Sequence, residues 1–165
     1  MNQQEKAFKE IFEANSKKIY HLCFGYTNDM DAANDLLQET FLKVWQNLHK
    51  FREKSQISTW IYRIAVNTCL TYLRKEKRQL KEELTINIIE NKTEDISDKQ
   101  EQVSLLYTCI AKLEENERLI ITMVMDEVTY PEIAEISGVS EGNLRVKIHR
   151  IKKKLTELYY QYEKL

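Results

Sequence analysis

Residues that interrupt helices are scarce in this chain. Only three Gly and one Pro occur among its 165 residues, whereas Leu, Ile, Glu and Lys are frequent. Because Gly and Pro are the strongest helix breakers, their scarcity predicts an all-α protein whose helices are joined by short turns. The hydrophobic content of 42% is ample for the core of one medium domain or of two small ones.

Long apolar runs and a cysteine framework are missing as well. No segment approaches the ~18 apolar residues that a membrane span needs, and the charged N-terminus does not look like a signal peptide. The three cysteines, Cys23, Cys69 and Cys109, are odd in number and widely spaced. They predict neither a disulfide framework nor a zinc site. We therefore expect a cytoplasmic protein that does not insert into the membrane and that needs no metal or cofactor.

Groupings that carry catalysis are also lacking. The three histidines, His21, His49 and His149, lie far apart, and no pair of carboxylates is arranged for acid–base chemistry. With three glycines, the chain has no glycine-rich loop to hold a phosphate. We therefore expect that the protein is not an enzyme.

The charge is strongly segregated, although the net charge is only −1. When Lys and Arg are counted against Asp and Glu, residues 50–81 carry about +7 and residues 141–165 about +4, while the rest of the chain is acidic. Two separate basic blocks are expected if two modules each contact phosphate.

Helical periodicity divides the chain in the same way. Apolar residues recur at helical spacing in residues 1–80 and again in residues 103–165. Residues 81–102 are acidic and lack this period, so we predict a flexible linker there. The predicted architecture is two small helical modules joined by that linker.

The second module contains the pattern of a helix-turn-helix. Pro131 suits the first position of a short helix, and Gly138 supplies the tight turn that ends it. Ser140 then caps a second helix. Four apolar residues of this helix recur at steps of four, three and four and give it one apolar face: Leu144, Ile148, Ile151 and Leu155. Its remaining face is basic, which predicts that the helix binds in a DNA major groove. The alternative is that these basic residues are merely exposed to solvent and keep the helix soluble.

A second polar stripe runs along the predicted long helix that ends near Arg78. Its members recur at steps of four, four, three and four: Arg63, Asn67, Thr71, Arg74 and Arg78. Arginines neutralise phosphate and an amide reads base edges, so the stripe predicts nucleic-acid contact rather than a plain solvated face. The aromatic residues nearby, Phe51, Trp60 and Tyr62, could either stack on exposed bases or belong to the core.

Two pairs of segments resemble the sigma-70 family of transcription initiation factors. Residues 35–45 (DLLQETFLKVW) and 59–67 (TWIYRIAVN) closely resemble its core-binding and promoter-melting module. Residues 130–136 (YPEIAEI) and 140–150 (SEGNLRVKIHR) look like the module that reads the minus-thirty-five element. Because only these two modules are present, the chain is similar to the small extracytoplasmic-function (ECF) subgroup.

The resemblance implies a role for each matching position. Core RNA polymerase would be contacted by Asp35, Gln38 and Glu39. The melted minus-ten element would be held by Phe51, Ile64 and Asn67, together with the polar stripe around them. The minus-thirty-five element would be bound by Ser140, Arg145, Val146, Lys147, His149, Arg150 and Lys153. Val146 and Asn143 replace residues that are common in the family, which leaves the recognised bases open.

The implied function is a sigma factor that binds core RNA polymerase, recognises both promoter elements and promotes melting of promoter DNA. An anti-sigma factor would be a further partner. The main alternative is a helix-turn-helix regulator, which would bind operator DNA as a symmetric dimer without core polymerase. A helical scaffold without DNA contacts is a weaker alternative, which salt-dependent binding would test.

Overall fold

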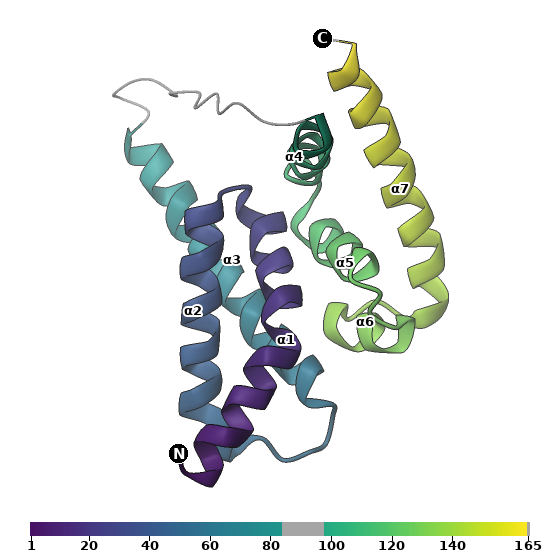
Figure 1. Ribbon diagram of the computed structural model, residues 1–165. Coiled ribbons are helices and arrows are strands. Elements are labelled where there is room, and N and C mark those ends of the chain that lie inside the picture. The colour runs from purple at the N-terminus through teal and green to yellow at the C-terminus, as the bar shows by residue number, and fades with distance from the viewer. Residues whose placement is uncertain (84–97, 165) are drawn as a thin grey trace.

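The computed structural model describes residues 1–83 and 98–164, and within these residues the protein is all-α (Figure 1). The first three helices are α1 (Gln3–Thr27), α2 (Met30–Asn47) and α3 (Ile57–Glu83), with a short 3-10 helix, η1 (Leu48–Lys50), after α2. Four helices follow: α4 (Asp98–Ile110), α5 (Glu115–Met125), α6 (Tyr130–Ser137) and α7 (Glu141–Glu163). The all-α fold predicted from the scarcity of Gly and Pro is confirmed.

Short polar residues set several helix ends. The Asn2 side chain and Glu5 form a capping box at the start of α1. Asn28 ends α1 in the left-handed region, with φ of 49°, and Asp29 accepts a hydrogen bond from the Ala32 N–H at 3.0 Å to cap α2. The turn between α1 and α2 therefore consists of the C-cap of one helix and the N-cap of the next.

The expected end of the long helix at Arg78 was too early. Helix α3 continues to Glu83, and α4 begins at Asp98, so helical structure enters both ends of the segment predicted as a linker. The extension has a simple cause, because residues 79–83 are Gln, Leu, Lys, Glu and Glu, which are good helix formers, and none of them is Gly or Pro. The rest of the predicted linker, residues 84–97, lies outside the described residues.

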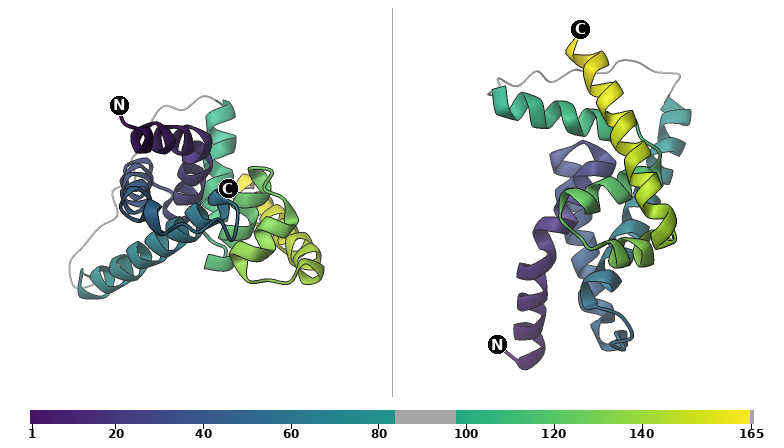
Figure 2. Two further views of the ribbon diagram at one scale, coloured as in Figure 1. Left: turned by 90° about the horizontal axis from the view of Figure 1, so that it is seen from below. Right: turned by 90° about the vertical axis from the view of Figure 1, so that its right-hand side faces the viewer.

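The first three helices and the last four pack against one another around one continuous core (Figures 1 and 2). Helix α1 lies between α2 and α3 on one side and α5 on the other, and α6 also reaches α3. Ile19, Leu22 and Cys23 of α1 are almost fully buried, as are Ile120 and Met123 of α5. The sequence predicted the two modules but not this contact between them.

The turn before α7 provides a test of this local geometry. Gly138 has φ of +74°, a conformation that costs other residues about 1–2 kcal/mol, so Gly138→Ala should lower the free energy of unfolding by that amount. Gly142 is the matched control, since it is helical and has nothing within 4 Å of its Cβ position. Gly142→Ala should raise the free energy of unfolding by up to about 1 kcal/mol. Urea denaturation measures both, and a stabilising Gly138→Ala would contradict the assignment.

Candidate nucleic-acid interface

Helices α6 and α7 form the helix-turn-helix that the sequence predicts. Pro131 lies in the first turn of α6, and Gly138 ends that helix. The Ser140 Oγ accepts a hydrogen bond from the Asn143 N–H at 3.3 Å and so caps α7. The apolar stripe of α7 is buried as expected, at Leu144, Ile148, Ile151 and Leu155.

The opposite face of α7 is open to solvent. The predicted contact residues on it are exposed, apart from the half-buried Lys147: Arg145, Val146, His149, Arg150 and Lys153. Val146 is 52% exposed although it is apolar. An apolar side chain on a basic face suits contact with a thymine methyl group, which is one of the features that a major groove displays.

Arg145 is held in place by an aromatic neighbour. Its guanidinium carbon lies 5.5 Å from the centre of the Tyr130 ring, within the range of a cation–π interaction. Because Tyr130 begins α6 and Arg145 lies in the first turns of α7, this contact spans the two helices of the motif. It orients the guanidinium before any DNA is bound.

Lys154 differs from the lysines beside it. Its ammonium group lies 2.6 Å from Glu117 Oε1, and this hydrogen bond raises the pKa of Lys154. Glu117 also accepts a hydrogen bond from the Glu114 N–H and so caps α5. Lys154 therefore joins α5 to α7, which leaves phosphate contact to its neighbours.

The polar stripe of α3 is exposed along its length: Arg63, Asn67, Thr71, Arg74 and Arg78. Arg63 is the member that touches the second module, because its Nη2 lies 3.4 Å from both the carbonyl oxygen and Oε1 of Glu135 on α6. Tyr62, beside it, is 2% exposed, so the core alternative holds for that aromatic residue.

A hollow of about 350 Å³ lies between α2 and α3, within the usual range of about 300–1,000 Å³ for ligand pockets. Helix α3 forms one wall of this hollow, with Trp60, Ile64, Asn67, Thr68 and Thr71. The other wall was missed by sequence reasoning and consists of Lys43, Asn47 and Lys50. The sequence does contain a pattern that could have predicted this wall, because the three residues are spaced by four and three and so share one helical face. Only the packing of α2 on α3 brings the two walls together.

The two walls use their polar groups differently. The Asn47 amide donates to the Lys43 carbonyl at 2.8 Å, and Lys43 Nζ donates to Thr68 Oγ1 at 3.1 Å. By contrast, no hydrogen bond within the described residues engages the Asn67 amide. Asn67 is therefore the amide in this hollow that is available to a ligand.

Phe51 does not line the hollow itself but packs against Trp60, which does. It is half-buried at the start of the loop before α3, and its ring centre lies 5.3 Å from that of Trp60. Trp60 itself lines the hollow. The structure thus brings Ile64 and Asn67 together, as predicted, and places Phe51 behind Trp60.

The predicted polymerase-binding residues share the solvent face of α2. Asp35, Gln38 and Glu39 are exposed, whereas Ala33, Leu36 and Val44 on the other face are buried. Gln38 also borders an apolar groove of about 540 Å³ between α1 and α2. The groove is lined mainly by Phe8, Phe12, Phe41, Leu42 and Trp45, of which Leu42 is 56% exposed and Phe12 38%.

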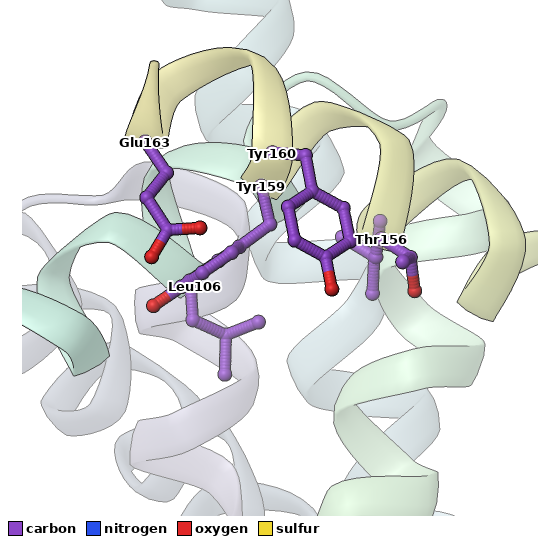
Figure 3. Close-up of a pocket in the computed structure, with 6 residues that line it drawn as sticks. Leu106, Thr156, Tyr159, Tyr160 and Glu163 are labelled. Atoms are coloured by element: carbon purple, nitrogen blue, oxygen red, sulfur yellow. The ribbon is translucent and has the colours of Figure 1, made fainter. Parts of the chain in front are cut away.

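A further hollow, of about 430 Å³, lies between α4 and the C-terminal end of α7 (Figure 3). Leu106 of α4 faces Tyr159, Tyr160 and Glu163 across it. None of the residues predicted to contact DNA or polymerase lines this hollow. It is therefore separate from the faces described above.

This fold, with an exposed reading helix in one module and a polar stripe beside a hollow in the other, defines a two-module helical DNA-binding protein. Residues 11–79 match the family Sigma-70 region 2, and residues 104–155 match Sigma-70, region 4. The chain belongs to the sigma-70 family, as an ECF sigma factor that binds core RNA polymerase and recognises promoter DNA.

Several relatives support this membership over most of the chain. The ECF RNA polymerase sigma-E factor of Salmonella typhimurium is 30% identical over 160 residues, which cover 88% of this chain and 83% of the relative. The ECF sigma factor SigM of Bacillus subtilis is 27% identical over 153 residues, covering 91% and 93%.

A solved structure shares the fold. The sigma factor RpoE of Bartonella quintana, in complex with the anti-sigma factor NepR, superposes with a TM-score of 0.72 at 23% identity, covering 93% of this chain and 96% of that one. None of the helices that the structure describes combines the length and apolarity needed to cross a bilayer.

Proposed function

We propose that this sigma factor divides promoter recognition between its two basic faces, while the solvent face of α2 contacts core polymerase. The exposed α7 face would read the minus-thirty-five element, and the hollow beside Asn67 would hold a base of the melted minus-ten strand. The observation that carries the proposal is the free Asn67 amide in a hollow with cationic residues on its opposite wall. Those lysines suit the phosphate of the nucleotide whose base the amide would read.

The proposed polymerase contact combines a polar edge with an apolar groove. Asp35, Gln38 and Glu39 form the edge, and Gln38 continues into the groove where Phe12 and Leu42 are exposed. Stable interfaces usually place apolar anchors beside a polar rim, so the two surfaces would act as one.

Charge reversal tests the polar edge. We expect Asp35→Lys with Glu39→Lys to weaken binding to core polymerase about tenfold or more, because both side chains are exposed and would lie at the interface. Folding should be nearly unaffected, since exposed substitutions usually change stability by less than about 0.5 kcal/mol. Fluorescence titration with core polymerase measures the affinity.

The matched control reverses the same number of charges elsewhere. Glu10→Lys with Glu13→Lys alters exposed residues of α1 and should leave the affinity unchanged. Equal affinities of the two double variants would refute the proposed polar edge.

The decisive experiment for the whole proposal is transcription in vitro. Purified chain and core polymerase would be tested on fragments that carry candidate promoters, and the chain should direct initiation that core alone does not. A helix-turn-helix regulator would instead bind its DNA as a dimer without polymerase. Initiation that does not depend on the chain would overturn the proposal.

Membership of the family also suggests one further partner and a location. Relatives of known structure were solved with the anti-sigma factor NepR and with the cytosolic domain of CnrY. We propose that an anti-sigma factor also binds this chain. We also propose a cytoplasmic location, because core polymerase and promoter DNA are found there.

A further inference from the structure

A hollow of about 580 Å³ lies where α7 packs against α5. Three of the residues predicted to bind the minus-thirty-five element line it, namely Val146, Lys147 and Arg150. Lys154 of α7 and Glu117 of α5 line it as well. This α5–α7 hollow therefore borders the candidate DNA-reading face.

Three cations follow one another along this side of α7. Lys147, Arg150 and Lys154 are spaced by three and four residues, so they share one face of the helix. Because a helix rises about 1.5 Å per residue, the three residues span about 10 Å. That length equals about three steps of about 3.4 Å along a DNA strand. By position alone, Lys154 would be expected to bind the DNA backbone next to Arg150.

Lys154, however, already has a charged partner. Its ammonium nitrogen lies 2.6 Å from Glu117 Oε1, and this hydrogen bond raises the pKa of Lys154, so the group stays charged. The Glu117 side chain is only 10% exposed, whereas that of Lys154 is 51% exposed. The carboxylate that holds Lys154 is thus set within the protein, while the lysine itself lies at the surface.

Two interactions keep the Glu117 carboxylate in place. Its Oε2 accepts a hydrogen bond from the Glu114 N–H at 3.2 Å, as part of the capping box that starts α5. A buried carboxylate that loses its charged partner is also strongly destabilising. Glu117 is therefore held between the start of α5 and the ammonium group of Lys154.

Further carboxylates lie close to the same pair. Lys154 and Glu117 line a second hollow, of about 340 Å³, together with Glu114, Glu157 and one other cation, Lys112. The charge of Glu114 adds to the attraction on Lys154. The ammonium group of Lys154 is thus drawn toward the acidic start of α5.

We propose that Glu117 is a further determinant of DNA recognition, which withholds Lys154 from the DNA backbone and so lowers the sequence-independent affinity of α7. The inference rests on the proposed function, because it assumes that the exposed face of α7 binds the minus-thirty-five element. Cations that bind phosphate strengthen binding to every sequence alike, whereas contacts to base edges distinguish sequences. With Lys154 withheld, binding depends more on base-reading residues such as Arg145.

Replacing Glu117 with Gln tests the proposal by releasing Lys154. Glutamine is also accepted at this position of a capping box, so the start of α5 should be kept. We expect Glu117→Gln to strengthen binding to preferred and scrambled upstream elements alike, by about three- to tenfold at about 0.1 M salt. The dependence of log affinity on log salt should steepen by about one, as for one added phosphate contact. Titration of short duplexes with holoenzyme at several salt concentrations measures both quantities.

Two lysine variants provide the matched comparison. Lys154→Met should leave the salt slope unchanged, because the charge of Lys154 is already withheld. Lys153→Met should lower the slope by about one, since Lys153 is exposed and forms no ion pair within the described residues. The double variant Glu117→Gln with Lys154→Met should return to the wild-type slope. That return would show that the gain in Glu117→Gln acts through Lys154 and not through the loss of a negative charge.

The possible outcomes separate this inference from the proposed function. An unchanged slope for Glu117→Gln, a steeper slope that persists in the double variant, or a lower slope for Lys154→Met would each overturn the inference alone. A purely structural ion pair would lower the urea midpoint of Glu117→Gln without steepening its salt slope, which would also overturn it. If Lys153→Met too leaves the slope unchanged, α7 does not bind the DNA backbone and the proposed function itself fails.

Discussion

Replacing Arg145 with Ala is expected to reduce the affinity of the holoenzyme for its preferred minus-thirty-five element by about 5- to 150-fold. A bidentate arginine contact to a base edge contributes about 1–3 kcal/mol of discrimination, and the loss should relax the preference at one base pair. Arg145 is exposed in the first turns of α7 and is already oriented by Tyr130. Selection from randomised upstream elements, followed by titration at several salt concentrations, would measure both effects.

Lys153→Ala is the matched control on the same helix. Lys153 is exposed near the C-terminal part of the reading face, where we expect phosphate contact only. Its loss should weaken all sequences alike and lower the salt slope by about one. If Lys153→Ala changed the selected sequence and Arg145→Ala did not, the proposed placement of α7 in the groove would be wrong.

Replacing Asn67 with Ala is expected to reduce promoter opening by about 10- to 100-fold while core binding stays unchanged. The Asn67 amide lies in the hollow between α2 and α3, where it would hydrogen-bond the exposed edge of an extruded base. Lost hydrogen bonds to a buried base edge would cost about 1–3 kcal/mol. Permanganate reactivity of melted thymines measures opening, and a core-binding titration checks holoenzyme formation.

Asn47→Ala makes the same chemical change on the opposite wall of the hollow. The Asn47 amide is already bonded to the Lys43 carbonyl, so its removal should reduce opening much less. Normal opening by the Asn67 variant on every promoter tested would show that this hollow does not hold the base.

Local patterns were enough to predict much of the molecule. The four residues of the predicted apolar stripe, Leu144, Ile148, Ile151 and Leu155, are all buried, and Ser140 caps α7 as expected. These features depend on neighbours within a turn or two of helix, so the order of residues along the chain determines them. The end of α3 was misplaced because the good helix formers after Arg78 carry little apolar periodicity.

Only one of the two walls of the candidate base-binding hollow could be predicted from the sequence. The stripe that contains Asn67 was predicted, but the wall formed by Lys43, Asn47 and Lys50 was not. The stripe lies on one helix and has a period, whereas the hollow exists only where α2 packs on α3. Phe51 packs against Trp60 and does not itself line the hollow, a position that depends on how the loop before α3 folds back.

The amino-acid sequence by itself determined the helices, the turn chemistry and the charged faces, because each is an interaction among residues close along the chain. Tertiary structure alone decided that the two modules share a core, that Gly25 admits α5, and that Arg63 pairs with Glu135. Such contacts join residues far apart in the chain: Arg63 and Glu135 are 72 positions apart, and Tyr26 and Glu115 are 89 positions apart. No local period reports on such pairs, because they form only when apolar faces of separate helices are buried together.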